Sequence, residues 1–108
     1  MTTTIAGTMA ALGDPTRVGI VNQLSKGTAS VTELASAFPM SLRGVLKHVQ
    51  VLEDAGLVRT TKVGRVRQCE LQAPAFDEAT RWITDVRRRW EGRLDRLDQL
   101  VRNQQEER

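Results

Sequence analysis

The sequence predicts a mainly helical domain with one small β-hairpin, an α+β fold. Over most of the chain, apolar residues recur every three or four positions, which is the spacing of helices with one buried face. Residues 57–71 differ, because β-branched and basic residues there flank a single glycine, as in a hairpin. At 108 residues the chain has the length of one domain with a modest core. We therefore expect a single domain over residues 1–108.

Two helices are predicted before residue 28. The first covers residues 4–12, and the second lies within residues 13–27. Asp14 is a suitable N-cap for the second helix, Pro15 fits its first turn, and Lys26-Gly27 favours its end. One side of the first helix is formed by Ile5, Met9 and Leu12. The apolar face of the second helix is formed by Val18, Ile20, Val21 and Leu24.

A third helix is predicted over residues 30–38. Ser30 and Glu33 have the spacing of a capping box, in which each side chain accepts a hydrogen bond from the other residue's backbone N–H. Leu34 and Phe38 form its apolar stripe. Pro39 favours its end, because a residue that precedes proline avoids the helical conformation.

A fourth helix follows at once, with Ser41 as its N-cap and Gly56 just past its end. Met40 and Val45 have the spacing of a hydrophobic staple. The core face comprises Val45, Val49 and Leu52. A second face is basic and partly apolar and comprises Leu42, Arg43, Leu46, Lys47 and Gln50. Two helices joined by a short turn, the second one basic, indicate a helix-turn-helix over about residues 30–56.

The next segment predicts a hairpin over about residues 57–71, with its turn at Val63-Gly64. Gly64 would supply the positive φ that a tight turn needs. The basic residues near the tip are Lys62, Arg65 and Arg67. A helix-turn-helix followed by a basic hairpin is a winged helix, in which the helix fits the major groove of DNA and the hairpin reaches the adjacent backbone or minor groove.

The net charge of +3 is concentrated in one central segment. Residues 1–40 are balanced and residues 69–108 are slightly acidic. The segment between them has only Glu53 and Asp54 against the basic residues Arg43, Lys47, Arg59, Lys62, Arg65 and Arg67. Such a segment indicates an anionic partner, most commonly nucleic acid. An ordinary solvated surface is the alternative.

Three stretches of the chain resemble the ArsR family of bacterial winged-helix repressors. They are "ALGDPTRVGIVNQL" (11–24), "SVTELASAFPMSLRGVLKHVQVLEDAGLV" (30–58) and the hairpin "KVGRVRQCEL" (62–71). The long last helix also fits this family. The resemblance implies a homodimer that binds an inverted-repeat operator in double-stranded DNA, usually as a repressor that an effector releases. It does not indicate which effector.

The chain departs from the metal-sensing members of that family. Where those members have a Cys-x-Cys pair, this chain has Ala35 and Ala37, and its last helix contains no histidine. One histidine, His48, and one cysteine, Cys69, are too few for a tight metal site, so we expect no metal and no cofactor. The resemblance places His48 at a structural position beside the core. Cys69 stands in place of a wing tyrosine and is expected to be a small buried hydrophobe, with a redox sensor as the alternative.

A long last helix is predicted over about residues 75–102. Its apolar stripe comprises Ile83, Val86, Trp90, Leu94, Leu97 and Val101. This stripe exceeds what the domain's own core can cover, which predicts the same helix of a second subunit as its partner. Met9, Leu12 and Trp82 are expected to join the dimer interface. Residues 87–89 are all arginine but lie among acidic residues, which favours a solvated ion-pair surface over a second DNA-binding patch.

The sequence therefore predicts a homodimeric, sequence-specific DNA-binding regulator, most simply a repressor. The expected DNA contacts are Ser41, Leu42, Arg43, Gly44, Leu46, Lys47 and Gln50 in the helix and Lys62, Arg65 and Arg67 in the wing. The two leucines suit thymine methyl groups, and Gly44 would allow close approach. The alternatives are a metal- or thiol-responsive repressor and a winged-helix module that binds other proteins.

Two other classes of protein are not indicated. The sequence shows no glycine-rich phosphate loop, no Ser-His-Asp set and no carboxylate pair in an apolar setting, so we expect no enzyme. No apolar run has the length of a membrane span, and the first residues lack the features of a secretory signal. We expect a cytoplasmic protein, in agreement with its single cysteine.

Overall fold

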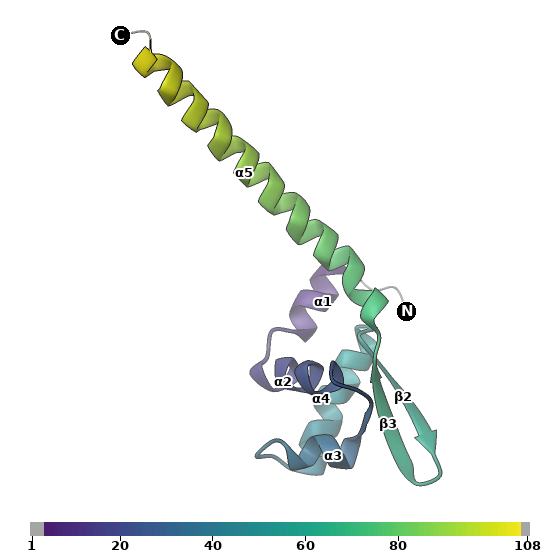
Figure 1. Cartoon of the computed structure of the whole chain (residues 1–108). Helices are drawn as coiled ribbons and strands as arrows, with labels where there is room; N and C mark the ends of the chain where they lie inside the picture. The colour runs from purple at the N-terminus through teal and green to yellow at the C-terminus, as the bar shows by residue number, and fades with distance from the viewer. Residues whose placement is uncertain (1–3, 107–108) are drawn as a thin grey trace.

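The computed structural model describes residues 4–106 and confirms the predicted α+β fold (Figure 1). Five α-helices, a three-stranded sheet and a short 3-10 helix follow one another along these residues. They are α1 (Ile5–Ala11), α2 (Pro15–Leu24), β1 (Ala29–Ser30), α3 (Val31–Ser36), α4 (Leu42–Asp54), β2 (Val58–Val63), β3 (Val66–Leu71), η1 (Ala73–Phe76) and α5 (Asp77–Glu106). Figure 1 shows α1 to α4 and the hairpin gathered at one end, with α5 projecting from them.

The helices begin where the sequence predicts their caps. The Asp14 carboxylate accepts hydrogen bonds from the backbone N–H groups of Thr16 and Arg17, at 2.8 and 3.1 Å. Both hydrogen bonds of the capping box between Ser30 and Glu33 are present. These contacts satisfy N–H groups that the first turn of a helix otherwise leaves without partners. They fix the start of α2 and α3, and with them the position of the helix-turn-helix.

The sheet contains one strand that the sequence analysis did not predict. Strand order is β1-β3-β2, all antiparallel, and β1 pairs Ala29 with Cys69. The hairpin turn is also one residue later than predicted, because Val63 pairs with Val66 and leaves Gly64 and Arg65 as the turn. Gly64 has φ of +64° and Arg65 does not have positive φ, which matches a two-residue turn that needs glycine only at its first position.

The core lies between α2, α3, α4 and the sheet. Its most buried side chains are Ile20, Leu34, Val45, Val49, Leu52, Leu57 and Cys69. Gly19 allows a close approach within it, because a Cβ there would lie 2.7 Å from Cε1 of Phe38. Any larger residue would push the Phe38 ring out of its place beside α2.

Five details of the helix predictions differ from the structure. Val18, predicted on the buried face of α2, is exposed, since two residues before Ile20 a side chain points to the other side of the helix. The second helix ends at Leu24 and the third at Ser36, each a few residues before its predicted stop. The last helix starts at Asp77 rather than 75, because η1 intervenes, and it continues to Glu106 rather than 102.

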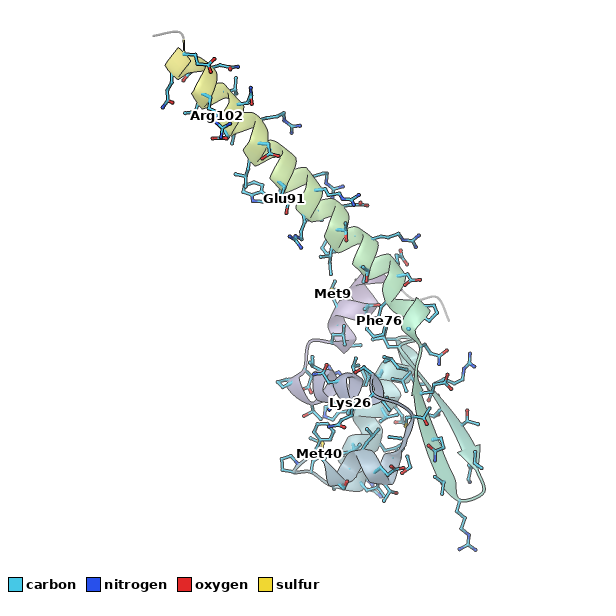
Figure 2. The ribbon with its side chains drawn as sticks, viewed as in Figure 1. Met9, Lys26, Met40, Phe76, Glu91 and Arg102 are labelled. Carbon is cyan, nitrogen blue, oxygen red and sulfur yellow. The ribbon has the colours of Figure 1, made fainter. Side chains whose placement is uncertain are left out.

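Helix α5 gives the molecule an elongated shape. Its 30 residues extend for about 45 Å, and Ala79 is its one buried residue. The radius of gyration is 20.5 Å, compared with about 13 Å for a compact domain of this length. In Figure 2 the labelled Glu91 and Arg102 lie on the part of α5 that extends away from the other elements. Within residues 4–106 no helix, α5 included, combines the length and apolarity needed to cross a membrane.

Candidate nucleic-acid interface

Helix α4 separates a core face from an exposed face. Val45, Val49 and Leu52 are completely buried. The exposed residues on the other side are Ser41, Leu42, Arg43, Lys47 and Gln50. Because the core face holds the helix against the domain, its cationic side is available to a ligand. A helix presented in this way has the width that the major groove of DNA admits.

Two predicted contact residues of α4 are only partly exposed. Leu46 packs against the core, so its side chain is shared between the domain and the surface. A Cβ at Gly44 would lie 3.4 Å from Ser41 Oγ and 3.6 Å from Met40 Sδ, which are ordinary contact distances. The fold therefore does not require glycine at position 44. Ser41 Oγ accepts a hydrogen bond from the Gly44 N–H, at 3.1 Å, and caps the helix.

The wing presents its cations on the side of the sheet that faces α4. Side chains alternate between the two faces of a strand, so Lys62 lies on the same face as Thr60, and Arg67 on the same face as buried Cys69. Lys62 and Arg67 are also direct partners across the hairpin. Like charges placed opposite each other destabilise a sheet slightly. Such a pair is explained most simply by an anionic ligand that neutralises it.

The cations of this surface have no acidic partners within residues 4–106. The ion pairs there are Arg87–Glu91 and Asp98–Arg102, and the Asp14 carboxylate also lies 3.9 Å from the His48 ring. None of them involves Arg43, Lys47, Lys62, Arg65 or Arg67. By contrast Arg59, on the other face of the wing, lies opposite Glu70. Within the described residues these five cations therefore gather, without an ion pair, on α4 and on the α4-facing side and tip of the wing.

A groove lies between α4 and the wing. It has a volume of about 220 Å³ and is lined by Leu42 and Leu46 of α4 together with Arg65, Val66 and Arg67. Val66 was not among the predicted site residues. Its signal in the sequence was an apolar residue directly after the turn Gly64-Arg65, where a solvated hairpin tip would normally be polar. The structure thus joins helix and wing into one surface.

Glu53 connects the end of α4 to the wing. Its Oε2 atom accepts hydrogen bonds from the backbone N–H and the side-chain hydroxyl of Thr60, at 3.0 and 2.7 Å. From the sequence, Glu53 was considered only as a negative charge. Its position shows a second role, because these two bonds fix β2, and with it the wing, relative to α4.

His48 and Cys69 occupy structural positions. His48 Nδ1 lies 3.2 Å from Arg17 Nη1 and 3.9 Å from Asp14 Oδ2. The backbone N–H groups of Arg17 and Thr16, with His48 nearby, hold the pKa of the Asp14 carboxyl below its ordinary value, against an opposing effect of partial desolvation. Cys69 is completely buried, and burial, with the Glu53 carboxylate, raises the pKa of its thiol. Within residues 4–106 no three His, Cys, Asp or Glu side chains are grouped as a metal site requires.

Most of the predicted dimer residues form an exposed apolar stripe along α5, and Met9 of α1 is exposed as well. Met9, Trp82, Ile83, Val86, Trp90, Leu94, Leu97 and Val101 are all exposed, and Leu100, which the prediction omitted, is exposed as well. Leu12 differs, because it is partly buried and packs against the core. Trp90 is 58% exposed, a large value for an apolar side chain of its size. Residues 87–89 lie elsewhere on the helix, with Arg87 paired to Glu91.

Comparisons with known proteins agree with this architecture. The family model described as "Helix-turn-helix domain" matches residues 12–61. The HTH-type transcriptional regulator NmtR of Mycobacterium tuberculosis is 39% identical over 61 residues, which are 56% of this chain and 51% of NmtR. The chain thus matches about half the length of this relative.

Solved structures give longer matches. An ArsR family transcriptional regulator of known crystal structure is 42% identical in sequence to this chain, with a TM-score of 0.75. The match covers 80% of this chain and 89% of that one. The homodimeric winged helix-turn-helix DNA-binding domain Mb0332 of Mycobacterium bovis is 24% identical, with a TM-score of 0.60 and coverage of 81% and 78%. The match to the Mycobacterium bovis domain supports the winged-helix fold. The match at 42% identity also shows the family. This chain belongs to the ArsR family of transcriptional regulators, which are not enzymes.

Proposed function

We propose that this chain acts as a homodimeric repressor that binds an inverted-repeat operator in double-stranded DNA. The observation that carries the proposal is the single cationic surface shared by α4 and the wing, which has no acidic partner within residues 4–106. Helix α4 would enter the major groove, and the wing would lie along the adjacent backbone or minor groove.

The residues of this surface divide into two classes of contact. Arg43, Lys47 and Gln50 extend from α4 and would bind base edges or phosphates, and the Ser41 hydroxyl would donate to a phosphate. Lys62, Arg65 and Arg67 would bind the sugar-phosphate backbone. Gly44 would allow the start of the helix to approach the DNA closely. The backbone contacts would position the protein, and the α4 contacts would select the sequence.

A second subunit would cover the apolar stripe of α5. The accessible surface of the isolated chain is 7939 Å², compared with about 6,000 Å² for a compact monomer of this mass. The excess follows from a helix whose large apolar residues are exposed. The Mycobacterium bovis relative of the same fold is itself described as homodimeric. Two copies joined along α5 would present two recognition helices, as an inverted repeat requires.

Repression is the simplest consequence of such binding. A protein that covers an operator overlapping a promoter blocks the polymerase without any further activity. Footprinting on the DNA upstream of the protein's own coding region, followed by in vitro transcription from the same fragment, tests this step. Protection of an inverted repeat together with a loss of transcript is the expected result.

Fluorescence anisotropy tests the DNA-binding proposal directly. The probe is a palindromic duplex selected from a random library, and the control is a scrambled duplex of equal length. We expect at least about 1,000-fold tighter binding to the selected duplex, and affinity that falls steeply with salt. Equal binding to both duplexes, or affinity that salt does not change, would contradict the proposal and favour a surface that binds other proteins.

A further inference from the structure

The groove between α4 and the wing is lined by both apolar and cationic side chains. Leu42, Leu46 and Val66 supply the apolar atoms, and Arg65 and Arg67 supply the charge. Val31 and Thr32, at the start of α3, complete the lining, so no acidic side chain lines the groove. These properties fit a polyanion that carries an apolar group beside its phosphates.

The two leucines of the groove differ in what they can do. Leu46 is partly buried and packs against the core, so it forms a wall of the groove. Leu42 is the first residue of α4 and is 52% exposed, and Val66 across the groove is 45% exposed. A ligand that covers an apolar side chain exposed at this point of the helix removes it from water, and this burial favours binding.

We propose that Leu42, with Val66 beside it, receives the 5-methyl group of one thymine in each half of the operator. The proposal rests on the proposed function, because it requires α4 in the major groove. On the major-groove edges of the four bases, the thymine methyl is the apolar group. The first residues of a recognition helix are those that reach base edges. Arg65 and Arg67 would hold the phosphates beside that thymine, so this groove would distinguish thymine from cytosine.

Deoxyuridine provides the test, because it differs from thymidine only by the missing methyl group. A palindromic duplex is first selected from a random library with the unmodified chain, and each thymine pair is then replaced by deoxyuridine. At one position per half-site we expect about fourfold weaker binding for each methyl removed, the effect of one buried carbon. The variant Leu42→Ala should bind thymidine and deoxyuridine duplexes equally at that position.

A matched control uses another exposed apolar residue of the same helix. Val51 is 40% exposed but does not line the groove. The variant Val51→Ala should therefore retain the discrimination between thymidine and deoxyuridine. Circular dichroism of both variants shows whether α4 remains folded.

The possible outcomes separate the two proposals. If the unmodified chain selects a sequence but deoxyuridine costs nothing at any position, the methyl contact is wrong and the operator-binding function stands. The methyl contact is also wrong, and the operator-binding function stands, if Leu42→Ala weakens binding to the thymidine and the deoxyuridine duplexes to the same extent. That result would indicate that Leu42 contacts deoxyribose instead. If no sequence is enriched from the library, both proposals fail.

Discussion

The side chains of Arg17 and His48 meet at 3.2 Å, between Nη1 and Nδ1, and so join helix α2 to helix α4. Because a guanidinium group can only donate, His48 accepts through Nδ1 and its ring proton is on Nε2. The same guanidinium donates from Nε to the Ala11 carbonyl, at 2.6 Å, at the C-terminal end of α1. Arg17 therefore connects three helices, of which α1 contacts α5 and α4 is proposed to contact DNA.

Replacing Arg17 with methionine should destabilise the domain. The change keeps the apolar part of the side chain but leaves the Ala11 carbonyl and His48 Nδ1 without their donor. We expect a loss of about 1–2 kcal/mol in the free energy of unfolding, measured by urea titration. Arg81→Met, on the exposed surface of α5, is the matched control and should leave the urea midpoint unchanged. An equal midpoint for the two variants would show that the junction contributes nothing.

Cys69 should be unreactive in the folded protein. Its side chain is completely buried, and burial raises the pKa of the thiol, so little of the nucleophilic thiolate is present at neutral pH. A thiol reagent such as Ellman's reagent should modify it at the rate at which the domain opens, and at once in denaturant. Rapid modification of the folded protein, with release of DNA, would instead support the thiol-responsive repressor.

Features governed by neighbouring residues were predictable from the sequence, and those governed by distant residues were not. The caps at Asp14 and Ser30 depend on residues two or three positions away, and all of them form. Strand β1 has only two residues, and it exists because Cys69, far along the chain, pairs with Ala29. No local pattern marks so short a strand. The prediction that Val18 is buried was wrong for the same reason, since periodicity does not show which side of α2 meets the core.

The candidate site likewise has features that the sequence predicts and features that depend on distant residues. The basic residues of α4 and the wing were recognisable from charge alone, and in the structure they are exposed. The groove that joins them was not recognisable, because it depends on how the folded wing lies relative to α3 and α4. Glu53 illustrates this limit, since its hydrogen bonds to Thr60 exist only once the wing folds back on the helix.

Removing one charge of the Lys62–Arg67 pair in the wing should have opposite effects on DNA binding and on stability. Lys62 and Arg67 are like charges that face each other across the hairpin. Lys62→Ala should weaken binding to all DNA sequences and reduce the slope of log affinity against log salt by about 1 for each subunit, so by about 2 for the dimer. It should leave thermal stability unchanged or raise it by a few tenths of a kcal/mol, because the repulsion is removed.

Arg59→Ala is the matched control for the wing. Arg59 lies opposite Glu70 on the other face of the hairpin, so its loss should lower stability slightly and leave the salt slope unchanged. Anisotropy titrations at several salt concentrations and a thermal melt of each variant provide the two measurements. If Lys62→Ala keeps the full slope, the wing does not contact the phosphates.

Truncation of the α5 stripe should dissociate the proposed dimer without unfolding the domain. Trp90 is 58% exposed in the single chain and takes no part in its core, so Trp90→Ala removes only intersubunit contacts. We expect the dimer dissociation constant to rise about 30-fold or more, as for a central interface tryptophan. Sedimentation velocity measures this, with circular dichroism as the check on folding. Arg88→Ala, on the opposite side of α5, should leave the dimer intact, and a tight dimer in both variants would place the interface elsewhere.

Gly44 should be a residue kept for DNA rather than for the fold. A Cβ at this position meets Ser41 Oγ and Met40 Sδ at ordinary contact distances, so Gly44→Ala should stabilise α4 by about 0.5–1 kcal/mol. The same methyl group would stand between the first turn of α4 and the DNA, so affinity for the operator should fall. Gly92→Ala in α5, where a Cβ would meet nothing within 4 Å, should give a similar gain in stability with no change in affinity. Thermal melts and anisotropy titrations of both variants separate the two effects. If Gly44→Ala binds DNA as tightly as the unmodified chain, the DNA does not approach the start of α4 closely.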